Sequence, residues 1–342
     1  MVDSLCSEID MRLKYYAINE VRTLYFGGGT PSLLQADDWL KLVETFQKYF
    51  IIEELKEFTI EANPDDINNE NLNIWRQIGV NRLSIGVQSF RNEDLVWMNR
   101  AHVALDSLNC IELAQNQGFT NISIDLMYGL PNQNLENWIA QLYQAGRLKV
   151  PHVSAYCLTV EERTALKKRV DLGDLVIPDD ELVEQQFNAL VDVLASFGLE
   201  QYEISNFALK GCEAIHNSNY WLGASYLAIG PSAHGYDGTC RYWNISNNRE
   251  YIKAISSGKL PQTTEHLSPK DQFNELILTG LRTKWGVDLN ELEKIHAFSD
   301  SFVAQLNAYL VSGIVEHNGH KIRLMPSAKI KADYYASQLF LD

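Results

Sequence analysis

Three consecutive glycines, Gly27, Gly28 and Gly29, end a β-branched and aromatic run and are followed directly by Thr30. Because glycine has no Cβ, such a turn lets backbone N–H and C=O groups approach a bound ligand closely. The spacing is neither the GxGxxG pattern of dinucleotide sites nor a P-loop, since no Lys–Ser/Thr pair follows the glycines. A glycine triplet alone is more often a tight turn than a ligand site. Its interpretation therefore depends on what the neighbouring strand ends carry.

Polar side chains recur where other predicted strands end. Beyond the glycine turn they are Glu61, Asn63, Gln88, Ser89, Asp125, Thr159 and Glu161. The carboxyl ends of parallel strands converge in space although they are distant in the sequence. These residues therefore predict the rim of a single ligand-binding site.

Five mostly apolar runs are the predicted strands that position these groups, at 23–26, 57–62, 82–87, 121–128 and 152–160. We read them as lacking strict alternation, which is typical of strands buried on both faces of a parallel sheet. Amphipathic helical segments lie between them, at 36–50, 70–79, 105–118 and 134–146. Alternating strands and helices indicate an α/β fold, either a barrel or a doubly wound sheet.

The composition limits the possible partners and location. The chain has 342 residues, of which 46% are hydrophobic, and a net charge of −15. That charge repels phosphate backbones and anionic lipid surfaces, so nucleic acid and membrane partners are not expected. No apolar run reaches about 18 residues, and the N-terminus has no basic-then-apolar stretch, so we expect a cytoplasmic protein. The five cysteines are odd in number and far apart, which is typical of reduced thiols.

The second half of the chain is less regular up to about residue 265, with one predicted helix at 179–197. After it we expect helices at 270–283, 289–296 and 300–310, then a hairpin turning at Asn318–Gly319. Helices followed by a hairpin are similar to a winged helix. That module often binds DNA, but in so acidic a chain a protein-docking domain is favoured. The predicted domains are the barrel, a bridge segment and a C-terminal helical domain, at 1–165, 166–265 and 266–342.

Six segments in this order carry a family resemblance: YFGGGTPSLL, TIEANPDD, RLSIGVQSF, ISIDLMYGLPNQ, QYEISNFA and HNSNYW. The chain resembles the oxygen-independent coproporphyrinogen III oxidase-like branch of the radical SAM superfamily, and more narrowly the haem chaperones of the HemW type. The similarity covers essentially the whole chain. It implies a partial (β/α)6 radical SAM barrel with a winged-helix-like C-terminal domain. It also implies S-adenosylmethionine (SAM) bound across the strand ends beside a [4Fe-4S] cluster.

Seven positions match the SAM-binding residues of that family: Gly28, Gly29, Thr30, Glu61, Gln88, Arg100 and Asp125. By resemblance, the first three would contact the amino group of the methionine moiety. The other four would surround its carboxylate, ribose and sulfonium. The side-chain chemistry agrees, because carboxylates accept hydrogen bonds from ammonium and ribose hydroxyl groups and a guanidinium pairs with a carboxylate.

A second element, HNSNYW, resembles the HNxxYW pattern associated with haem binding in the chaperone branch. A neutral imidazole is a common proximal ligand of haem iron, so His216 is the candidate metal ligand. Tyr220 and Trp221 would cover an apolar porphyrin face. A purely structural role for His216 remains the alternative. His234 is a second candidate, for which a packing role is favoured.

Members of the family begin with a strand and a loop carrying CxxxCxxC, whose three thiolates hold the cluster, and this sequence has no such motif. The resemblance places Cys6 in the helix that follows that loop. We therefore expect that the sequence starts roughly 35 residues late, judged against the length of a βα unit, and that the first barrel strand is missing. Without cluster ligands, this polypeptide should not support radical chemistry as written.

Three functions remain open. The first is a haem chaperone that binds haem and passes it to an acceptor protein. The second is an oxygen-independent coproporphyrinogen III dehydrogenase of porphyrin biosynthesis, since both branches share the barrel motifs. The third is a SAM- or haem-binding protein without a cluster.

Overall fold

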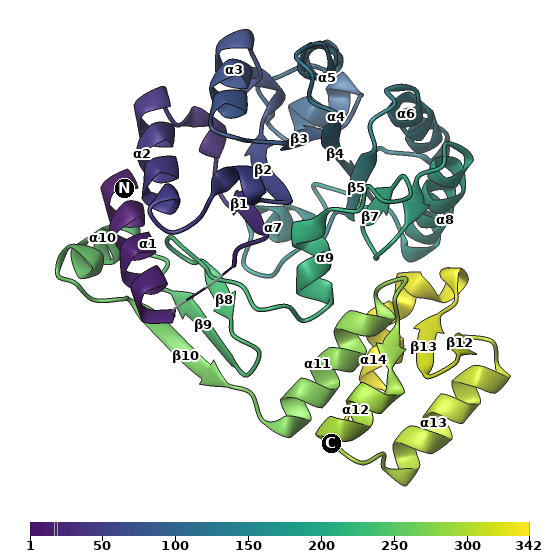
Figure 1. Ribbon diagram of the computed structural model, residues 1–342. Coiled ribbons are helices and arrows are strands. Elements are labelled where there is room, and N and C mark those ends of the chain that lie inside the picture. The colour runs from purple at the N-terminus through teal and green to yellow at the C-terminus, as the bar shows by residue number, and fades with distance from the viewer. Residues whose placement is uncertain (17, 19, 342) are drawn as a thin grey trace. The chain divides into compact units, whose positions relative to one another are not determined.

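A seven-stranded sheet in the order β1-β2-β3-β4-β5-β7-β6 carries the predicted strand-end residues (Figure 1). Its strands are β1 (Thr23–Phe26), β2 (Glu57–Ala62), β3 (Arg82–Gln88), β4 (Asn121–Tyr128), β5 (His152–Cys157), β6 (Glu200–Gln201) and β7 (Asn206–Ala208). Strands β2 to β5 pair in parallel, whereas β7 pairs antiparallel with both β5 and β6. The five predicted strands are confirmed, although β3 ends one residue later and β5 three residues earlier than expected.

The structure describes residues 1–16, 18 and 20–341, and these form two compact units. Unit 1 contains Met1–Leu24, Leu34–Glu57 and Ile215–Asp342, and unit 2 contains Tyr25–Leu33 and Phe58–Ala214. Each unit therefore draws on segments that are distant in the sequence. The division into three consecutive domains at 166 and 266 stays a prediction.

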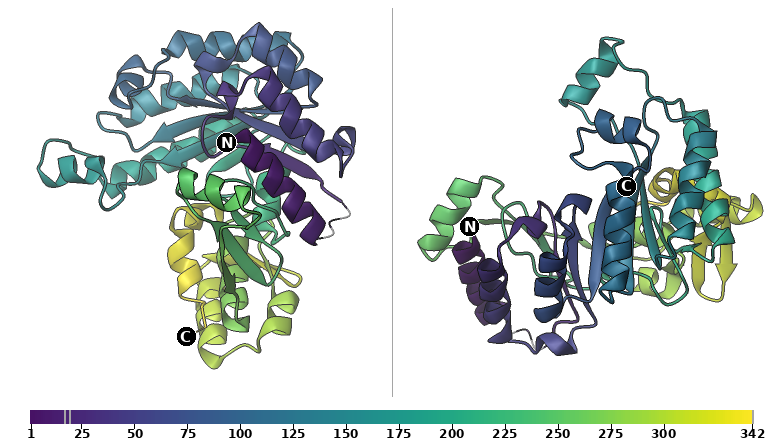
Figure 2. Two further views of the ribbon diagram at one scale, coloured as in Figure 1. Left: turned by 90° about the vertical axis from the view of Figure 1, so that its left-hand side faces the viewer. Right: turned by 90° about the horizontal axis from the view of Figure 1, so that it is seen from above.

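The helices between the strands are confirmed in position. They are α2 (Ala36–Gln47), α3 (Asn69–Gln77), α5 (Ala104–Asn116), α6 (Leu135–Arg147) and α8 (Asp180–Ser196). Three begin at a side chain that accepts a backbone N–H of the first turn, from Asn68, Asn134 or Asp179. Such caps satisfy groups that a helix leaves without partners. A short α4 (Asn92–Trp97) and an exposed α7 (Ala165–Asp171), which projects from the sheet of unit 2 in Figure 2, were not predicted.

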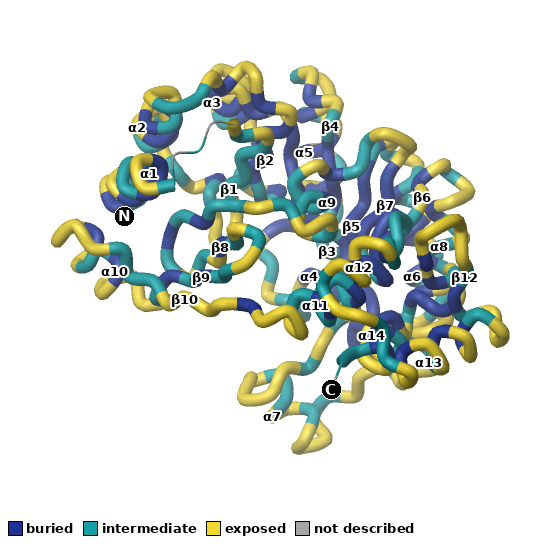
Figure 3. Tube along the Cα trace, turned by 60° about the horizontal axis from the view of Figure 1, so that its bottom comes forward, coloured by how far each residue is buried: buried dark blue, intermediate teal, exposed yellow. Residues whose placement is uncertain are grey.

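The sheet is buried on both faces, but one face is polar, and here the sequence analysis was wrong. In β2, in β3 apart from Gly86, and in the first residues of β4 (121–126) and β5 (152–155), apolar residues alternate with polar ones. The register aligns the polar residues in rows, Glu61 with Ser84 and Asp125 with Ser154. Successive residues of the central strands, polar ones included, are buried (Figure 3), so burial did not require both faces to be apolar. The polar rows, rather than the strand ends alone, build the interior of unit 2.

Unit 1 contains a three-stranded antiparallel sheet of β8 (His234–Tyr236), β9 (Cys240–Asn244) and β10 (Gln262–His266). A buried network joins this sheet to α1 (Val2–Tyr16). The guanidinium of Arg12 donates to Glu8 at 2.7 Å, and to Asn244 and Gln262 at 2.8 Å. The hydroxyl of Tyr251 in α10 (Asn248–Ser256) also donates to Glu8, at 2.6 Å. A charge in the core is tolerated here because its donors find partners.

The C-terminal part of unit 1 has the element order of a winged helix: α11 (Pro269–Leu281), β11 (Val287–Asp288), α12 (Leu289–Ile295), α13 (Asp300–Val311), β12 (Val315–Asn318) and β13 (Lys321–Leu324). Its sheet has the order β11-β13-β12. The predicted hairpin turn is confirmed, and Gly319 has a φ of +64° that favours glycine. Within the described ranges, none of the helices combines the length and apolar character needed to cross a membrane.

Candidate functional site

The glycine turn after β1 has one packed and two open positions. A Cβ on Gly27 would lie 2.4 Å from the Tyr25 ring and 2.6 Å from the Glu61 carboxyl carbon. A Cβ on Gly28 or Gly29 would meet no heavy atom within 4 Å, and Gly28 has a φ of +73°. Gly27 is therefore needed for packing. The other two expose their backbone to open space, which is the requirement for close contact with a ligand.

Glu61 fastens this turn to β2. Its carboxylate accepts the N–H of Gly28 at 3.0 Å and the hydroxyl of Tyr25 at 2.6 Å. Burial and the neighbouring Glu61 charge raise the pKa of Tyr25, so its hydroxyl remains a donor. Tyr25 was not among the predicted site residues. Its position two residues before the triplet, on the same face of the strand as Gly27, was the available signal.

Gln88 and Arg100 come together beside β3. Gln88 has a φ of +65° at a break in the β3–β4 register. The guanidinium of Arg100 donates to the carbonyl of Gly86 at 3.1 Å and to the side chain of Asn63 at 2.8 Å. A Cβ on Gly86 would lie 3.0 Å from the Gln88 amide nitrogen and 3.3 Å from Arg100. A side chain at this position would therefore crowd the ends of the Gln88 and Arg100 side chains, which would have to shift by a few tenths of an ångström.

Asp125 lies in the polar row of β4. Burial raises its pKa to about 6, while the Arg82 charge and hydrogen bonds from Ser154 and Ser84 oppose that rise and the Glu61 charge adds to it. Asp125 and Glu61 therefore influence each other within unit 2. Arg82 is 3% exposed, and its Nε has no hydrogen-bond partner among the described residues. Arg82 was missed in the sequence analysis, although it begins the alternating run of β3.

Other predicted rim residues are not brought into this arrangement. Thr30 is exposed, and across the described chain its side chain has no hydrogen bond. Thr159 is on a loop, where its hydroxyl donates to the carbonyl of Cys157 at 3.5 Å. Glu161 is exposed in the same loop. The structure thus gathers Gly28, Glu61, Gln88, Arg100 and Asp125 in unit 2.

The HNSNYW segment forms α9 (Ile215–Trp221) in unit 1. The buried carboxylate of Glu57 accepts the N–H groups of Ile215 at 2.7 Å and His216 at 3.0 Å, so it caps the helix start. Both ring nitrogens of His216 are engaged: Nδ1 shares a hydrogen bond with the Thr23 hydroxyl and Nε2 with the Tyr220 hydroxyl, each at 2.8 Å. His216 must give up one of these bonds before it can bind iron.

The remaining aromatic candidates lie near His216. The ring of Tyr220 is 4.9 Å from that of His216, in an edge-on arrangement, and burial raises the pKa of Tyr220 to about 12. The guanidinium of Arg282 lies 5.4 Å from the ring of Trp221. His234 lies elsewhere in unit 1, exposed on β8.

The cysteines form no cluster site. Cys6 and Cys110 are buried and Cys157 is exposed. Over residues 1–16, 18 and 20–341, no three His, Cys, Asp or Glu side chains gather where a metal ion could be held. The donor set of this chain therefore does not match the three clustered thiolates that an iron–sulfur cluster needs.

Comparisons with known proteins identify the relatives of the chain. The family model of the Radical SAM superfamily matches residues 5–141, and that of the HemN C-terminal domain matches residues 267–329. Heme chaperone HemW of Lactococcus lactis subsp. lactis (strain IL1403) is 36% identical over 292 residues, or 85% of this chain and 77% of that protein. Heme chaperone HemW of Bacillus subtilis (strain 168) is 34% identical over 315 residues, or 91% and 83%.

One solved structure shares the fold over nearly the whole chain. It is coproporphyrinogen III oxidase (HemN) from Escherichia coli, described as a radical SAM enzyme, with a TM-score of 0.83 and 22% identity. The match covers 99% of this chain and 82% of that protein. At this identity the likeness establishes an α/β radical SAM fold and nothing finer.

Proposed function

Because the chain belongs to the HemW family within the radical SAM superfamily, we propose that it is a haem chaperone that binds haem and passes it to an acceptor protein. The observation that carries the proposal is the identity of 36% and 34% to two proteins named for that function, over most of the length of each. In this function haem is the cargo. The acceptor must compete for it, so binding must be reversible.

SAM is the proposed second ligand, held in unit 2. The residues there fit it, since Gly28 and Gly29 border open space and have no side chains to fill it. Glu61 and Asp125 supply acceptors for ammonium and ribose hydroxyl groups, and Arg100 supplies donors for a carboxylate. Gln88 can orient the ribose, and the exposed side chain of Thr30, which follows Gly29 directly, would contact the amino group only once the ligand is bound. When bound, SAM would supply a sulfonium whose positive charge the two carboxylates stabilise.

Contacts among the residues of unit 2 prepare this site. Tyr25 and Glu61 hold the glycine turn in place, and Asn63 holds Arg100 beside β3. Preorganisation of this kind reduces the entropy that binding must overcome. The cysteines do not fit an iron–sulfur cluster, so no step of the proposal involves one. A partial (β/α)6 barrel without its first strand stays a proposal for the finer fold.

Titration with haem, followed by its Soret absorbance, tests the function. We expect saturation near one haem per chain, and then transfer of the haem to apomyoglobin, used as a generic acceptor. A chain that leaves the haem spectrum unchanged is not a haem chaperone. If that chain instead binds coproporphyrinogen III, the oxidase function of the solved relative would be favoured.

A further inference from the structure

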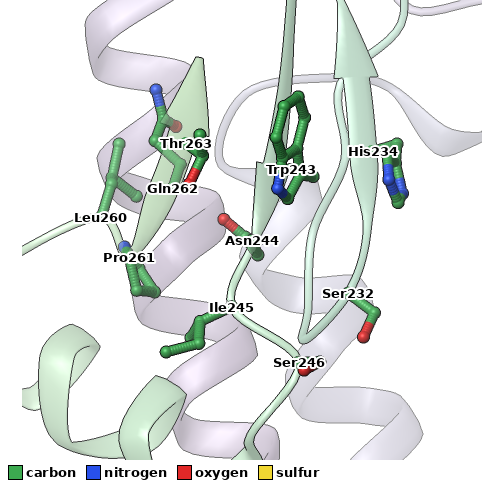
Figure 4. Close-up of a pocket in the computed structure, with 10 residues that line it drawn as sticks. All are labelled: Ser232, His234, Trp243, Asn244, Ile245, Ser246, Leu260, Pro261, Gln262 and Thr263. Atoms are coloured by element: carbon green, nitrogen blue, oxygen red, sulfur yellow. The ribbon is translucent and has the colours of Figure 1, made fainter. Parts of the chain in front are cut away.

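Two of the cavities differ in what lines them. The larger, of about 570 Å³, lies beside the β8–β9–β10 sheet in unit 1, and Figure 4 shows its mostly polar lining. The side chains of Asn244 and Gln262 there accept the hydrogen bonds of the buried Arg12, so their oxygens are already engaged. The smaller, of about 410 Å³, lies in unit 2 and combines apolar walls with two cations. Nothing in the proposed function uses this second cavity.

The walls of the unit 2 cavity are built where α6 and α8 end. Phe197 packs against the last turn of α6, because a Cβ on Gly146 would lie 2.3 Å from its ring. The N–H of Leu209, just after β7, donates to the carbonyl of Pro151, just before β5, at 2.9 Å. These contacts fix the walls before a ligand binds, which lowers the cost of ordering the site.

The uncharged part of the lining is entirely apolar. Besides Arg147 and Lys149, the lining residues are Gly146, Val150, Phe197, Leu199 and Leu209. A sugar, a nucleotide or an extended peptide would leave hydrogen-bonding groups without partners against such walls, whereas an aliphatic chain has none to satisfy. The volume lies within the range of about 300–1,000 Å³ that is usual for small-molecule sites. The lining therefore selects a ligand with a hydrocarbon body.

The two cations select the other end of the ligand. Arg147 and Lys149 are exposed, and neither forms an ion pair within the part of the chain that the structure describes. An unpaired guanidinium and ammonium favour a carboxylate, to which arginine can donate two parallel hydrogen bonds. Cations at a helix end also complement the helix dipole, which is sufficient to explain Arg147 in the last turn of α6.

The helix end does not explain Lys149. This residue lies two positions beyond α6 and has a φ of +56°, in the left-handed region where a Cβ lies close to the following carbonyl oxygen. Three other helices of unit 2, α3, α5 and α8, have glycine at the same position: Gly79, Gly118 and Gly198. Lysine therefore costs stability that these helices avoid. A role in binding an anion accounts for a lysine where the backbone favours glycine.

We propose that this cavity binds a fatty-acid carboxylate, with its hydrocarbon chain against Phe197 and Leu209 and its carboxylate paired with Arg147 and Lys149. Burial of the chain would supply most of the affinity, and the charge-assisted hydrogen bonds would orient the ligand. The proposal goes beyond the proposed function and does not depend on it, since none of the lining residues is a candidate for binding SAM or haem.

Isothermal titration of the full chain with dodecanoate, kept below its critical micelle concentration, tests the assignment. We expect saturation near one dodecanoate per chain. Dodecyltrimethylammonium has the same tail and the opposite charge, so it should bind about tenfold more weakly or worse, because the two cations repel it. Decanoate should bind more weakly than dodecanoate, by up to about fourfold for each missing CH₂.

Lys149→Gly separates ligand binding from stability. Dodecanoate should bind this variant about tenfold more weakly, because the carboxylate loses a charged partner. The midpoint of thermal unfolding should nevertheless rise by about 1–2 °C, because the strained residue is removed. Lys210→Gln is the matched control, an exposed cation next to Leu209 that does not line the cavity, and its affinity should stay within about twofold of the parent.

Unchanged dodecanoate affinity in Lys149→Gly would overturn the proposal, as would equal affinity for the two amphiphiles of opposite charge. An acidic peptide with a central phenylalanine represents the competing ligand class. If this peptide binds more tightly than dodecanoate, and Lys149→Gly abolishes that binding, the cavity is a protein-docking site and the fatty-acid assignment fails. None of these outcomes depends on whether the chain binds haem.

Discussion

Two glutamates on β2, four residues apart, each hold a segment that carries predicted ligand residues. One segment keeps these residues accessible to a ligand, and the other has them engaged in hydrogen bonds. Glu61 fastens the glycine turn but leaves Gly28 and Gly29 facing open space. Glu57 caps α9, where the bonds of His216 to Thr23 and Tyr220 leave neither ring nitrogen ready for a ligand. A motif therefore identifies which residues are near a site. The hydrogen bonds they already make decide whether they can bind.

The largest loss of stability is expected when Glu57 is replaced. Glu57→Ala removes a buried carboxylate that accepts two backbone N–H groups in partly buried positions. The free energy of unfolding should fall by about 3 kcal/mol, since each N–H group that loses its acceptor away from bulk water costs about 1–3 kcal/mol. Urea unfolding followed at 222 nm measures it.

Two controls accompany this change. Glu57→Gln keeps one good acceptor and should lose roughly half as much. Glu53→Ala, at an exposed glutamate nearby, should change the stability by less than about 0.5 kcal/mol. A loss below about 1 kcal/mol in Glu57→Ala would mean that α9 is held in place by other contacts and would remove one side of the comparison.

The buried carboxylate of Asp125 lowers the stability of the native state at neutral pH. Its pKa, raised by burial to about 6, lies above the usual 3.8, so the native carboxyl binds a proton more tightly than the unfolded one. Between about pH 4 and about pH 6 the unfolded chain has lost this proton while the native chain still holds it, so stability falls as the pH rises across that window. Asp125→Asn should therefore raise the free energy of unfolding at pH 7.5 by up to about 3 kcal/mol, because the rise is about two pKa units at about 1.4 kcal/mol each.

The pH dependence checks the cause. The gain from Asp125→Asn should shrink steadily below pH 6 and vanish near pH 4, as read from thermal unfolding at a series of pH values. Asp192→Asn, at an exposed position of α8, is the matched control and should show no such trend. An equal gain at every pH would indicate that packing, not charge, explains the effect.

The glycine turn separates ligand contact from stability. Gly29→Ala adds a methyl group that meets no protein atom within 4 Å, so stability should change by less than about 0.5 kcal/mol. If SAM lies against this turn, the same methyl group should weaken SAM binding at least tenfold, or about 1.4 kcal/mol. Isothermal titration measures the binding. Unchanged SAM affinity would remove Gly29 from the site.

Gly27→Ala is the contrasting variant in the same turn. Its Cβ would overlap Tyr25 and Glu61, so we expect a stability loss of about 1–3 kcal/mol from overpacking. The two variants thus test different roles, packing at Gly27 and contact with a ligand at Gly29. Equal stability losses at Gly27 and Gly29 would show that the turn is not open on one side.

The sequence was sufficient for the strands of unit 2 because their apolar runs are bounded by clear turn residues. The observed bounds of β1, β2 and β4 match the prediction. The polar interior was missed because burial was taken to require apolar residues, although β3 alternates visibly from Arg82 onward. The short strands β6 to β10 are set by pairing between distant segments, and local pattern carries little information about that.

The candidate site was predicted unevenly for a related reason. Residue type can indicate that His216 suits iron. No sequence pattern indicates that Thr23, 193 positions away, already shares a hydrogen bond with its ring. The same limit applies to His234, whose neighbour Trp243 follows from the pairing of β8 with β9. Side-chain satisfaction depends on tertiary contacts, which motifs do not record.

The smallest expected effect on stability comes from a variant that tests the comparison directly, because it frees Nε2 of His216 from its hydrogen bond. Tyr220→Phe removes the hydroxyl that engages Nε2 of His216 at a cost within about 1 kcal/mol. Haem titration should show binding about three- to tenfold tighter than in the parent, because iron at Nε2 of His216 no longer has to replace a hydrogen bond. Tyr226→Phe is the control, since its ring contacts Tyr220 but does not bond His216. If Tyr220→Phe leaves haem binding unchanged, the hydrogen bond of Tyr220 is not what keeps Nε2 of His216 from iron, and shape rather than hydrogen bonding must limit this site.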